Sequence, residues 1–324
     1  EAEGIKAVLE AAGVDAAGVA TFSGISTSYT GATGLFTGLI VGILGMELYC
    51  ALRKVEGLKI KMPDMVPPGV AKAFEVTIPT FLALMIVATV GWLSTTFLGL
   101  PLNDLISTYL QQPLKAIIGS NIIAVMILYV IIMLFWCVGI HGNNMVAAVK
   151  STIFDPMIVE NMEIYSKTKD MGQVPNVLNI VMMQMFAEWG GSGVTLALII
   201  AIFLFSKRED NKTIAKLSVV PGLFNINETM TFGIPLVLNP VLDIPFIFAP
   251  VITVLVGYIL TVVGFCPKTV ISVPWTTPPL LQGFLATGGN IMGAVSQLIV
   301  IALAVVIYTP FLLVYEKQQD AGNI

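Results

Sequence analysis

The sequence predicts an all-α, polytopic membrane protein, with transmembrane helices plus broken or re-entrant helical hairpins. Of its 324 residues, 56% are hydrophobic and only 11% are charged, against about 25% charged residues in an ordinary soluble domain. The mean hydropathy is +0.90. Long apolar runs recur along the chain, and several are interrupted by Gly, Pro, Asn and Glu. We therefore expect an integral membrane protein rather than one large soluble core.

Charge and cysteine content argue against several other classes of protein. The net charge is −4 and no basic stripe is present, so nucleic-acid binding is not expected. Neither a metal site nor a disulfide framework is indicated, because Cys50, Cys137 and Cys266 lie far apart and form no CxxC pair. No cofactor is predicted. The chain opens on Glu1 without a charged n-region or cleavage site, so we expect a fragment or processed form that lacks N-terminal spans.

The first third of the chain is predicted to be a scaffold. An apolar run just long enough to cross a bilayer follows a Gly/Ser/Thr-rich stretch. It ends in a loop with four basic residues, which favours the cytoplasmic side. Prolines separate this loop from a second span, whose Trp92 is expected in an interfacial aromatic belt. The expected elements are a span at 35–52, the basic loop at 53–62, a span at 76–100 and an interfacial helix at 102–119.

The rest of the chain alternates clean apolar segments with interrupted ones. Clean spans are expected at 117–140, 245–266 and 290–315, with a polar stretch at 150–177. The interrupted segments are 177–205, with a Gly-Gly-Ser-Gly turn, 217–240, broken by Pro221, Pro235 and Pro240, and the Pro/Gly-rich 267–289. Non-helical backbone persists at membrane depth only where protein buries it or where it lines a wet cavity. Such segments usually mark the binding site of a transporter, so this region is predicted to bind the substrate.

Glu228 is a strong candidate for a functional side chain. It lies in FNINETMTFGIP, flanked by Asn225 and Asn227. A carboxylate at the centre of a span costs roughly 2.5–3.5 kcal/mol even on a lenient scale, so a polar ligand, an ion or a proton path usually explains it. The alternative is a solvated loop at the membrane edge. The asparagines favour a ligand, because carboxamides both donate and accept hydrogen bonds and so match sugar hydroxyls.

The only histidine of the chain, His141, stands in the stretch WCVGIHGNN. A lone histidine is as often structural as functional. Here Trp136 precedes it, and Asn143 and Asn144 follow it. An aromatic face beside carboxamides commonly holds a sugar ring, because CH groups pack on the indole while hydroxyls bind the amides. These residues are therefore predicted to form one wall of a sugar site, with Glu228 on the opposing wall.

Two further residues extend this pattern. Trp275 stands in a Pro/Gly-rich segment beside Thr276 and Thr277, and the alternative for both Trp136 and Trp275 is a place in the interfacial belt. Glu188, in FAEWGGSG, is another acidic residue within an apolar run. Both a contact with substrate and a structural ion pair remain open for it. The predicted sugar-binding residues are Trp136, Asn143, Asn144, Asn227 and Trp275.

Several motifs together resemble a known family. The stretches FNINETMTFGIPLVLNP, IHGNN, GGSG and KMPDMVPPGVAKAF are similar to those of the membrane-embedded IIC component of the bacterial phosphoenolpyruvate-dependent sugar phosphotransferase system, in its lactose/cellobiose/diacetylchitobiose group. The similarity runs from about residue 30 to the C-terminus. Thr229 departs from the family pattern, which has proline after the glutamate, but it leaves the carboxylate in place.

The resemblance implies a homodimer, with a dimerising scaffold in residues 1–116 and a sugar-binding domain in residues 117–324 that moves to give alternating access. It implies that a β-linked disaccharide crosses the cytoplasmic membrane and is phosphorylated on its 6-hydroxyl. The phosphate would come from a phosphocysteine on a separate IIB protein, with IIA upstream. Glu228 and His141 match the family positions near the reacting hydroxyl, so they are the predicted catalytic pair.

Two other functions compete with this one. In a proton-coupled secondary transporter, Glu228 would bind the coupling proton and no phosphate would be transferred. An intramembrane hydrolase could use Glu228 with His141, although a metal-dependent version would be expected to contain more than one histidine. The motifs do not distinguish among cellobiose, lactose and diacetylchitobiose as the sugar.

Overall fold

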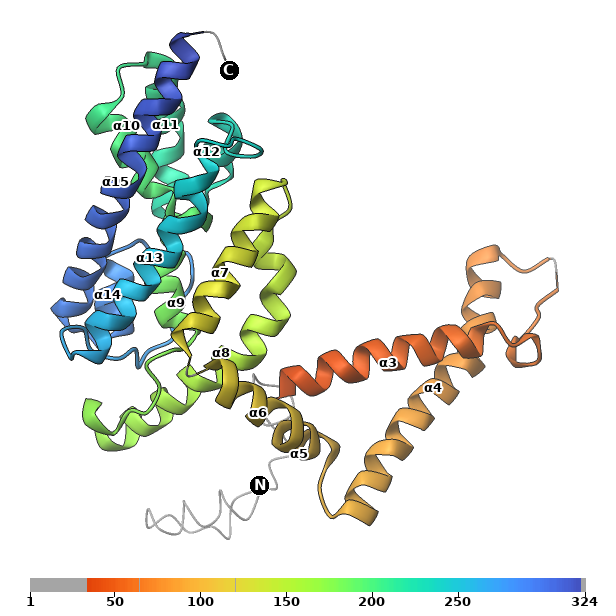
Figure 1. Cartoon of the computed structure of the whole chain (residues 1–324). Helices are drawn as coiled ribbons and strands as arrows, with labels where there is room; N and C mark the ends of the chain where they lie inside the picture. Colours follow the sequence, from red (N-terminus) through yellow and green to blue (C-terminus); the bar gives the residue numbers. More distant parts are fainter. Residues whose placement is uncertain (1–33, 64, 120, 322–324) are drawn as a thin grey trace, which may run out of the picture. The chain divides into compact units, whose positions relative to one another are not determined.

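The computed structural model describes residues 34–63, 65–119 and 121–321, and these residues form helices and connecting segments without any strand (Figure 1). The chain divides into two compact units. We call residues 1–111 unit 1 and residues 112–324 unit 2. The role of the N-terminal region as a dimerising scaffold stays a prediction.

Unit 1 is built on two long helices that pack against each other, α3 (Leu35–Arg53) and α4 (Pro68–Leu98). The second begins earlier than the expected span at 76–100, because proline suits the first turn of a helix, where its missing N–H has no intrahelical partner. It ends at Leu98, and its C-cap residue Gly99 has the left-handed conformation. The shorter elements are η3 (Glu56–Leu58), α5 (Leu102–Ile106) and η4 (Ser107–Gln111), the last a π-helical turn.

Unit 2 contains the other helices of the described residues. In chain order they are α6 (Gln112–Leu114), η5 (Lys115–Gly119), α7 (Ile122–Cys137), α8 (Gly142–Thr168), η6 (Met171–Gln173), α9 (Ile180–Ala187), η7 (Ser192–Val194), α10 (Leu196–Phe205), α11 (Glu209–Leu223), α12 (Glu228–Gly233), α13 (Asp243–Val262), α14 (Leu281–Ala286) and α15 (Ile291–Asp320). Helix α13 packs against α7, α9 and α15, while α15 also packs against α10 and α14. The expected polar stretch at 150–177 is largely helical, as part of α8.

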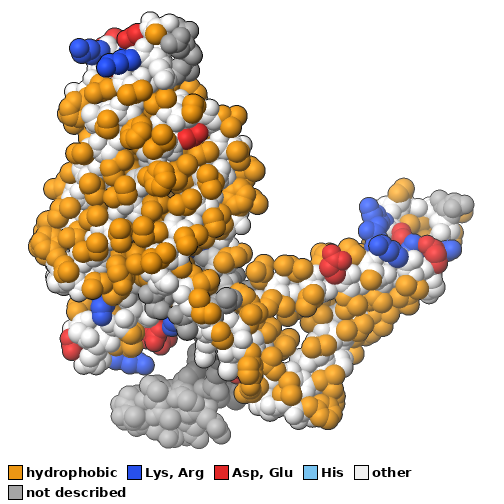
Figure 2. All heavy atoms as spheres, in the orientation of Figure 1, with side chains coloured by type: hydrophobic (Ala, Val, Ile, Leu, Met, Phe, Trp, Pro, Cys, Tyr) orange, Lys and Arg blue, Asp and Glu red, His pale blue; other side chains and the backbone are white. Residues whose placement is uncertain are grey.

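Four helices of the described residues are long and apolar enough to cross a membrane, namely α3, α4, α13 and α15. A fifth span is counted if the bent pair α9 and α10 is taken as one. Figure 2 shows hydrophobic side chains over most of the visible side of unit 2, with charged side chains gathered toward its ends. This distribution fits a protein whose sides face lipid, because charged groups are excluded from the hydrocarbon core. The prediction of an all-α polytopic membrane protein is confirmed.

The interrupted segments 177–205 and 217–240 contain the expected breaks. The segment Ile180–Val194, which contains α9 and η7, is bent by 64° from α10. Gly190, Gly191 and Gly193, between α9 and α10, have φ values of +72°, +85° and +75°. These left-handed values favour glycine. In the other segment, helix α11 ends at Leu223 and α12 begins at Glu228. The expected break around Pro235 is present, because α12 ends at Gly233 and Pro235 and Pro240 lie in the non-helical stretch before α13. Pro221 instead lies inside the last turn of α11.

Polar side chains satisfy the backbone of the first break, which lies among fully buried residues. The Thr195 hydroxyl donates to the Gly190 carbonyl at 2.6 Å, and the Tyr308 hydroxyl of α15 donates to the Gly193 carbonyl at 2.6 Å. A Cβ on Gly193 would come within 2.1 Å of the Phe246 ring of α13. The break is therefore a stable part of the core, because the carbonyl groups that it frees accept hydrogen bonds from buried side chains instead of water.

Candidate functional site

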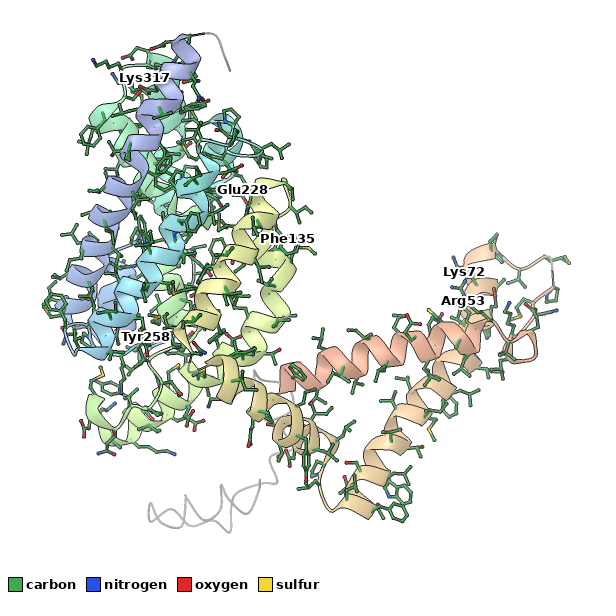
Figure 3. The ribbon with its side chains drawn as sticks, in the orientation of Figure 1. Arg53, Lys72, Phe135, Glu228, Tyr258 and Lys317 are labelled. Atoms are coloured by element: carbon green, nitrogen blue, oxygen red, sulfur yellow. The ribbon has the colours of Figure 1, made fainter. Side chains whose placement is uncertain are left out.

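The first turns of two helices bring His141 and Glu228 together. His141 is the N-cap residue of α8, and Glu228 is the first residue of α12. The distance from His141 Nε2 to Glu228 Oε1 is 3.9 Å, and the side chains are 39% and 47% exposed. In Figure 3, Glu228 lies close to the end of α7 from which the chain continues to His141. Two residues 87 positions apart (228 − 141 = 87) thus face one another at an accessible place.

The local hydrogen bonds indicate which imidazole nitrogen of His141 bears the proton. The backbone N–H of Asn144 donates to His141 Nδ1 at 3.3 Å, so Nδ1 is an acceptor. In a neutral imidazole the other nitrogen then bears the proton. The Nε2–H is therefore available on the side of the Glu228 carboxylate. At 3.9 Å the two groups are too far apart for a direct hydrogen bond.

Trp136, at the end of α7, supports the histidine. Its ring centroid lies 4.5 Å from that of His141, with the planes tilted by 50°. The indole is only 2% exposed, and its Nε1–H has no hydrogen-bond partner among the described residues. Gly142 permits the close approach of α8 to α7, because a Cβ there would lie 1.9 Å from the Ile132 carbonyl oxygen. The turn between α7 and α8 thus places the His141 ring against the Trp136 indole.

The two asparagines after His141 have different surroundings. Asn144 is exposed and provides the backbone N–H that binds His141. Asn143 donates from Nδ2 to Ser192 Oγ at 3.0 Å, and its Oδ1 accepts from Lys150 Nζ at 3.3 Å. Asn143 therefore joins the start of α8 to the break after α9.

Asn227, which precedes Glu228, also contacts this break. Its Nδ2 donates to the Ser192 carbonyl at 3.3 Å and to Thr231 Oγ1 at 2.8 Å, and the residue is 4% exposed. A Cβ on Gly191 would lie 2.6 Å from Asn227 Cβ. The break thus holds the residue before Glu228 by hydrogen bonding and by close packing.

Trp275 connects to the same region through its backbone. Its side chain is 55% exposed, and its carbonyl accepts from Asn225 Nδ2 at 2.6 Å. Asn225 also donates to the Thr277 carbonyl at 3.0 Å and accepts from the Gly190 N–H at 2.7 Å. Asn225 has a φ of +64°, which asparagine tolerates better than most residues. One carboxamide therefore ties three non-helical segments together, a role that the sequence analysis did not assign to it.

Comparison with known proteins assigns the family. The family described as "Phosphotransferase system, EIIC" matches residues 3–250. This chain belongs to that family. The resemblance found in the sequence motifs is confirmed.

Two relatives of this EIIC chain are named as specific for oligo-beta-mannosides and for cellobiose. The chain is 36% identical over 289 residues to the oligo-beta-mannoside-specific EIIC component of Bacillus subtilis (strain 168), covering 89% of this chain and 64% of the relative. It is 35% identical over 313 residues to the cellobiose-specific EIIC component of Lactococcus lactis subsp. lactis (strain IL1403), covering 91% and 63%. The chain therefore spans just under two thirds of the length of these relatives.

A solved structure has the same fold as this EIIC chain. It is the crystal structure of the transporter ChbC, the IIC component from the N,N'-diacetylchitobiose-specific phosphotransferase system. The TM-score is 0.82 at 35% sequence identity, and the match covers 93% of this chain and 69% of that one. The overall fold described above is therefore that of a solved IIC component.

Glu188 of this EIIC chain has a partner that the sequence analysis did not identify. Lys150 Nζ lies 2.5 Å from Glu188 Oε1, and the Tyr129 hydroxyl donates to the same oxygen at 2.8 Å. The side chains of Lys150 and Glu188 are 8% and 15% exposed. The spacing of Asn143 and Lys150, seven residues apart on α8, could have indicated a shared helix face.

Proposed function

We propose that this EIIC chain takes up a β-linked disaccharide of the cellobiose, diacetylchitobiose or lactose type across the bacterial cytoplasmic membrane. In this proposal, a separate IIB protein phosphorylates the 6-hydroxyl of the sugar during uptake. The names of the relatives support this substrate class, since they specify cellobiose, oligo-beta-mannoside, lactose and N,N'-diacetylchitobiose.

The 3.9 Å separation of His141 Nε2 and Glu228 Oε1 is the observation that carries the proposal. A hydroxyl group both donates and accepts hydrogen bonds. A sugar hydroxyl placed between the two side chains would donate its proton to the carboxylate and accept from the imidazole Nε2–H. The gap is too wide for a direct hydrogen bond and suits one bridging oxygen. The partial exposure of both side chains supports access of a ligand.

The chemistry of phosphoryl transfer assigns a role to each side chain. The sugar oxygen forms a bond to phosphorus while the bond from phosphorus to the cysteine sulfur of IIB breaks. Glu228 accepts the proton that leaves the hydroxyl, as a general base. His141 holds the hydroxyl in line and stabilises the charge that develops on the phosphoryl oxygens.

The cysteines of this chain favour an external phosphate donor. Cys137 and Cys266 are buried, and Cys50 lies within helix α3 of unit 1. None of them stands in a solvated loop of the kind that cradles a phosphate. A phosphocysteine on IIB, supplied in turn by IIA, would therefore provide the phosphoryl group. We further propose that the transporter is a homodimer in which residues 1–116 contribute the dimerising scaffold and residues 117–324 the sugar-binding domain.

Uptake by proteoliposomes tests this proposal against a proton-coupled transporter. Vesicles containing the purified protein would receive radiolabelled cellobiose, lactose or N,N'-diacetylchitobiose, with or without phosphorylated IIB. Sugar phosphate should form only in the presence of phosphorylated IIB. Accumulation of unmodified sugar that follows an imposed proton gradient and needs no IIB would contradict the proposal and favour the secondary transporter.

A further inference from the structure

The deepest ion pair among the described residues joins α8 to the break after α9, beside the proposed sugar site. It consists of Lys150 and Glu188, 2.5 Å apart and 8% and 15% exposed. Other described ion pairs, such as Lys115 with Glu160 at 2.8 Å, are more exposed, at 32% and 44%. Burying two charges costs several kcal/mol per ion unless the pair and its hydrogen bonds offset the desolvation. A buried pair is therefore weak support for a purely stabilising role.

The hydrogen bonds of the pair lead to Asn143. Lys150 donates both to Glu188 Oε1 and to Asn143 Oδ1. Because a lysine ammonium can only donate, it fixes the amide oxygen of Asn143 on its own side. The Asn143 amide nitrogen then points to Ser192 Oγ, at 3.0 Å. Ser192 thus accepts one N–H of the Asn143 carboxamide, and the second N–H is left to bind a ligand.

The same path continues toward Glu228. The carbonyl of Ser192 accepts from Asn227 Nδ2 at 3.3 Å, and Asn227 immediately precedes Glu228. The Tyr129 hydroxyl of α7 donates to the same Glu188 oxygen that Lys150 contacts, at 2.8 Å. The network thus joins α7, α8, the break after α9 and the start of α12, which are the elements around the proposed site.

We propose that Lys150 and Glu188 are positioning residues for sugar recognition, which act by fixing the carboxamide of Asn143 so that it presents an N–H donor to an oxygen of the sugar. The inference rests on the proposed function. In this arrangement the two sides of the sugar site differ in chemistry, because Asn143 donates a hydrogen bond to the sugar while Glu228 accepts one from it. Reversal of the carboxamide would present a carbonyl oxygen, which can only accept a hydrogen bond, in place of this donor.

A double variant that removes both charges tests the positioning of Asn143 without leaving a buried charge unpaired. Lys150→Met with Glu188→Gln removes both charges together, so no buried charge is left without a partner. The glutamine introduced by Glu188→Gln keeps an oxygen for the Tyr129 hydroxyl, and methionine fills the space of the lysine stem. The matched control is Lys115→Met with Glu160→Gln, which neutralises another ion pair of unit 2 whose hydrogen bonds do not reach Asn143.

The experiment measures melting temperature, equilibrium binding of cellobiose, lactose and N,N'-diacetylchitobiose, and KM and kcat of IIB-dependent phosphorylation. The double variant should melt within a few degrees of the wild type, while sugar affinity falls about tenfold, the size expected for losing one oriented hydrogen bond. KM should rise by the same factor and kcat should change less than about threefold, since this contact is made before and during the reaction. The control variant should bind sugar as the wild type does.

An Asn143→Ala background tests whether the pair acts through Asn143. Alanine at this position should weaken binding about as much as the double variant does, and the triple variant should lose no more, because contacts in one network are not additive. Full binding by the double variant, or losses that multiply in the triple variant, would overturn the inference while leaving the proposed function intact.

If the double variant does not fold, Asn143→Ala alone tests the inference, because wild-type affinity in that variant would show that the Asn143 carboxamide does not contact the sugar and would overturn the inference. If the wild type binds none of the three sugars, the proposed function fails, and the inference fails with it.

Discussion

His141 Nε2 faces Glu228 Oε1 across 3.9 Å, from the starts of two different helices. Separate contacts hold the two side chains in position. The first turn of α8 holds the imidazole through the N–H of Asn144. The Asn227 contacts with the break after α9 hold the start of α12. Because neither group needs the other for its position, the space between them is suited to a hydroxyl group that both can bind.

Replacing His141 should slow phosphorylation without abolishing it. In His141→Gln the amide N–H can take the place of the imidazole Nε2–H, so we expect kcat to fall by about tenfold or less. His141→Ala removes the donor and should reduce kcat further. The IIB-dependent rate at saturating sugar measures both effects. Equal rates for the glutamine and alanine variants would show that the donor at this position does not matter.

The two tryptophans should differ in how their loss affects the protein. Trp275 is 55% exposed, so Trp275→Ala should weaken sugar binding by about 1–3 kcal/mol without lowering the melting temperature. Trp136 is buried against His141. Trp136→Ala should therefore reduce both affinity and stability, the latter by about 3–5 kcal/mol.

A conservative variant separates the two effects at Trp136. Trp136→Phe keeps most of the packing against His141 but lacks the indole N–H. Equilibrium binding and thermal unfolding of all three variants give the comparison. If neither Trp275→Ala nor Trp136→Phe changes sugar affinity, both tryptophans serve only in packing or in the interfacial belt.

Gly191 should be intolerant of a side chain. Its φ is +85° and a Cβ would lie 2.6 Å from Asn227 Cβ. Gly191→Ala should destabilise the protein by more than about 1 kcal/mol and should also weaken sugar binding, because it displaces the residue before Glu228. Gly38→Ala is the matched control, since Gly38 lies within α3 and its added Cβ would meet nothing within 4 Å. A Gly191→Ala protein with wild-type stability and affinity would refute this reading of the break.

Much of the fold could be predicted from local sequence features. Apolar runs of bilayer length predicted α3, α13 and α15 with first and last residues close to the observed ones, because the hydrocarbon thickness sets the length of a span. The Gly-Gly-Ser-Gly turn marked the bend between α9 and α10. Pro235 and Pro240 marked the non-helical stretch between α12 and α13. Pro221 did not end its helix where it stands, because near the end of α11 it removes only one backbone hydrogen bond.

The site was only partly predictable, because its contacts are long-range. Motifs and the resemblance indicated His141 and Glu228, and the structure brings these two together. No local sequence feature indicated that Lys150, at the edge of a polar stretch, would form an ion pair with Glu188, which lies 38 residues further along the chain. The connecting role of Asn225 was missed for the same reason, since its partners lie 35 to 52 residues away.

The general-base role of Glu228 is the central claim, and Glu228→Gln tests it most directly. Glutamine keeps the shape and one hydrogen-bonding oxygen but cannot accept the proton of the sugar hydroxyl. The measurement pairs equilibrium sugar binding with IIB-dependent sugar-phosphate formation on the same purified protein. We predict that the variant retains measurable sugar binding while phosphorylation falls by about 100-fold or more. Phosphorylation at a near wild-type rate would contradict the claim and leave Glu228 as a sugar ligand or a structural group.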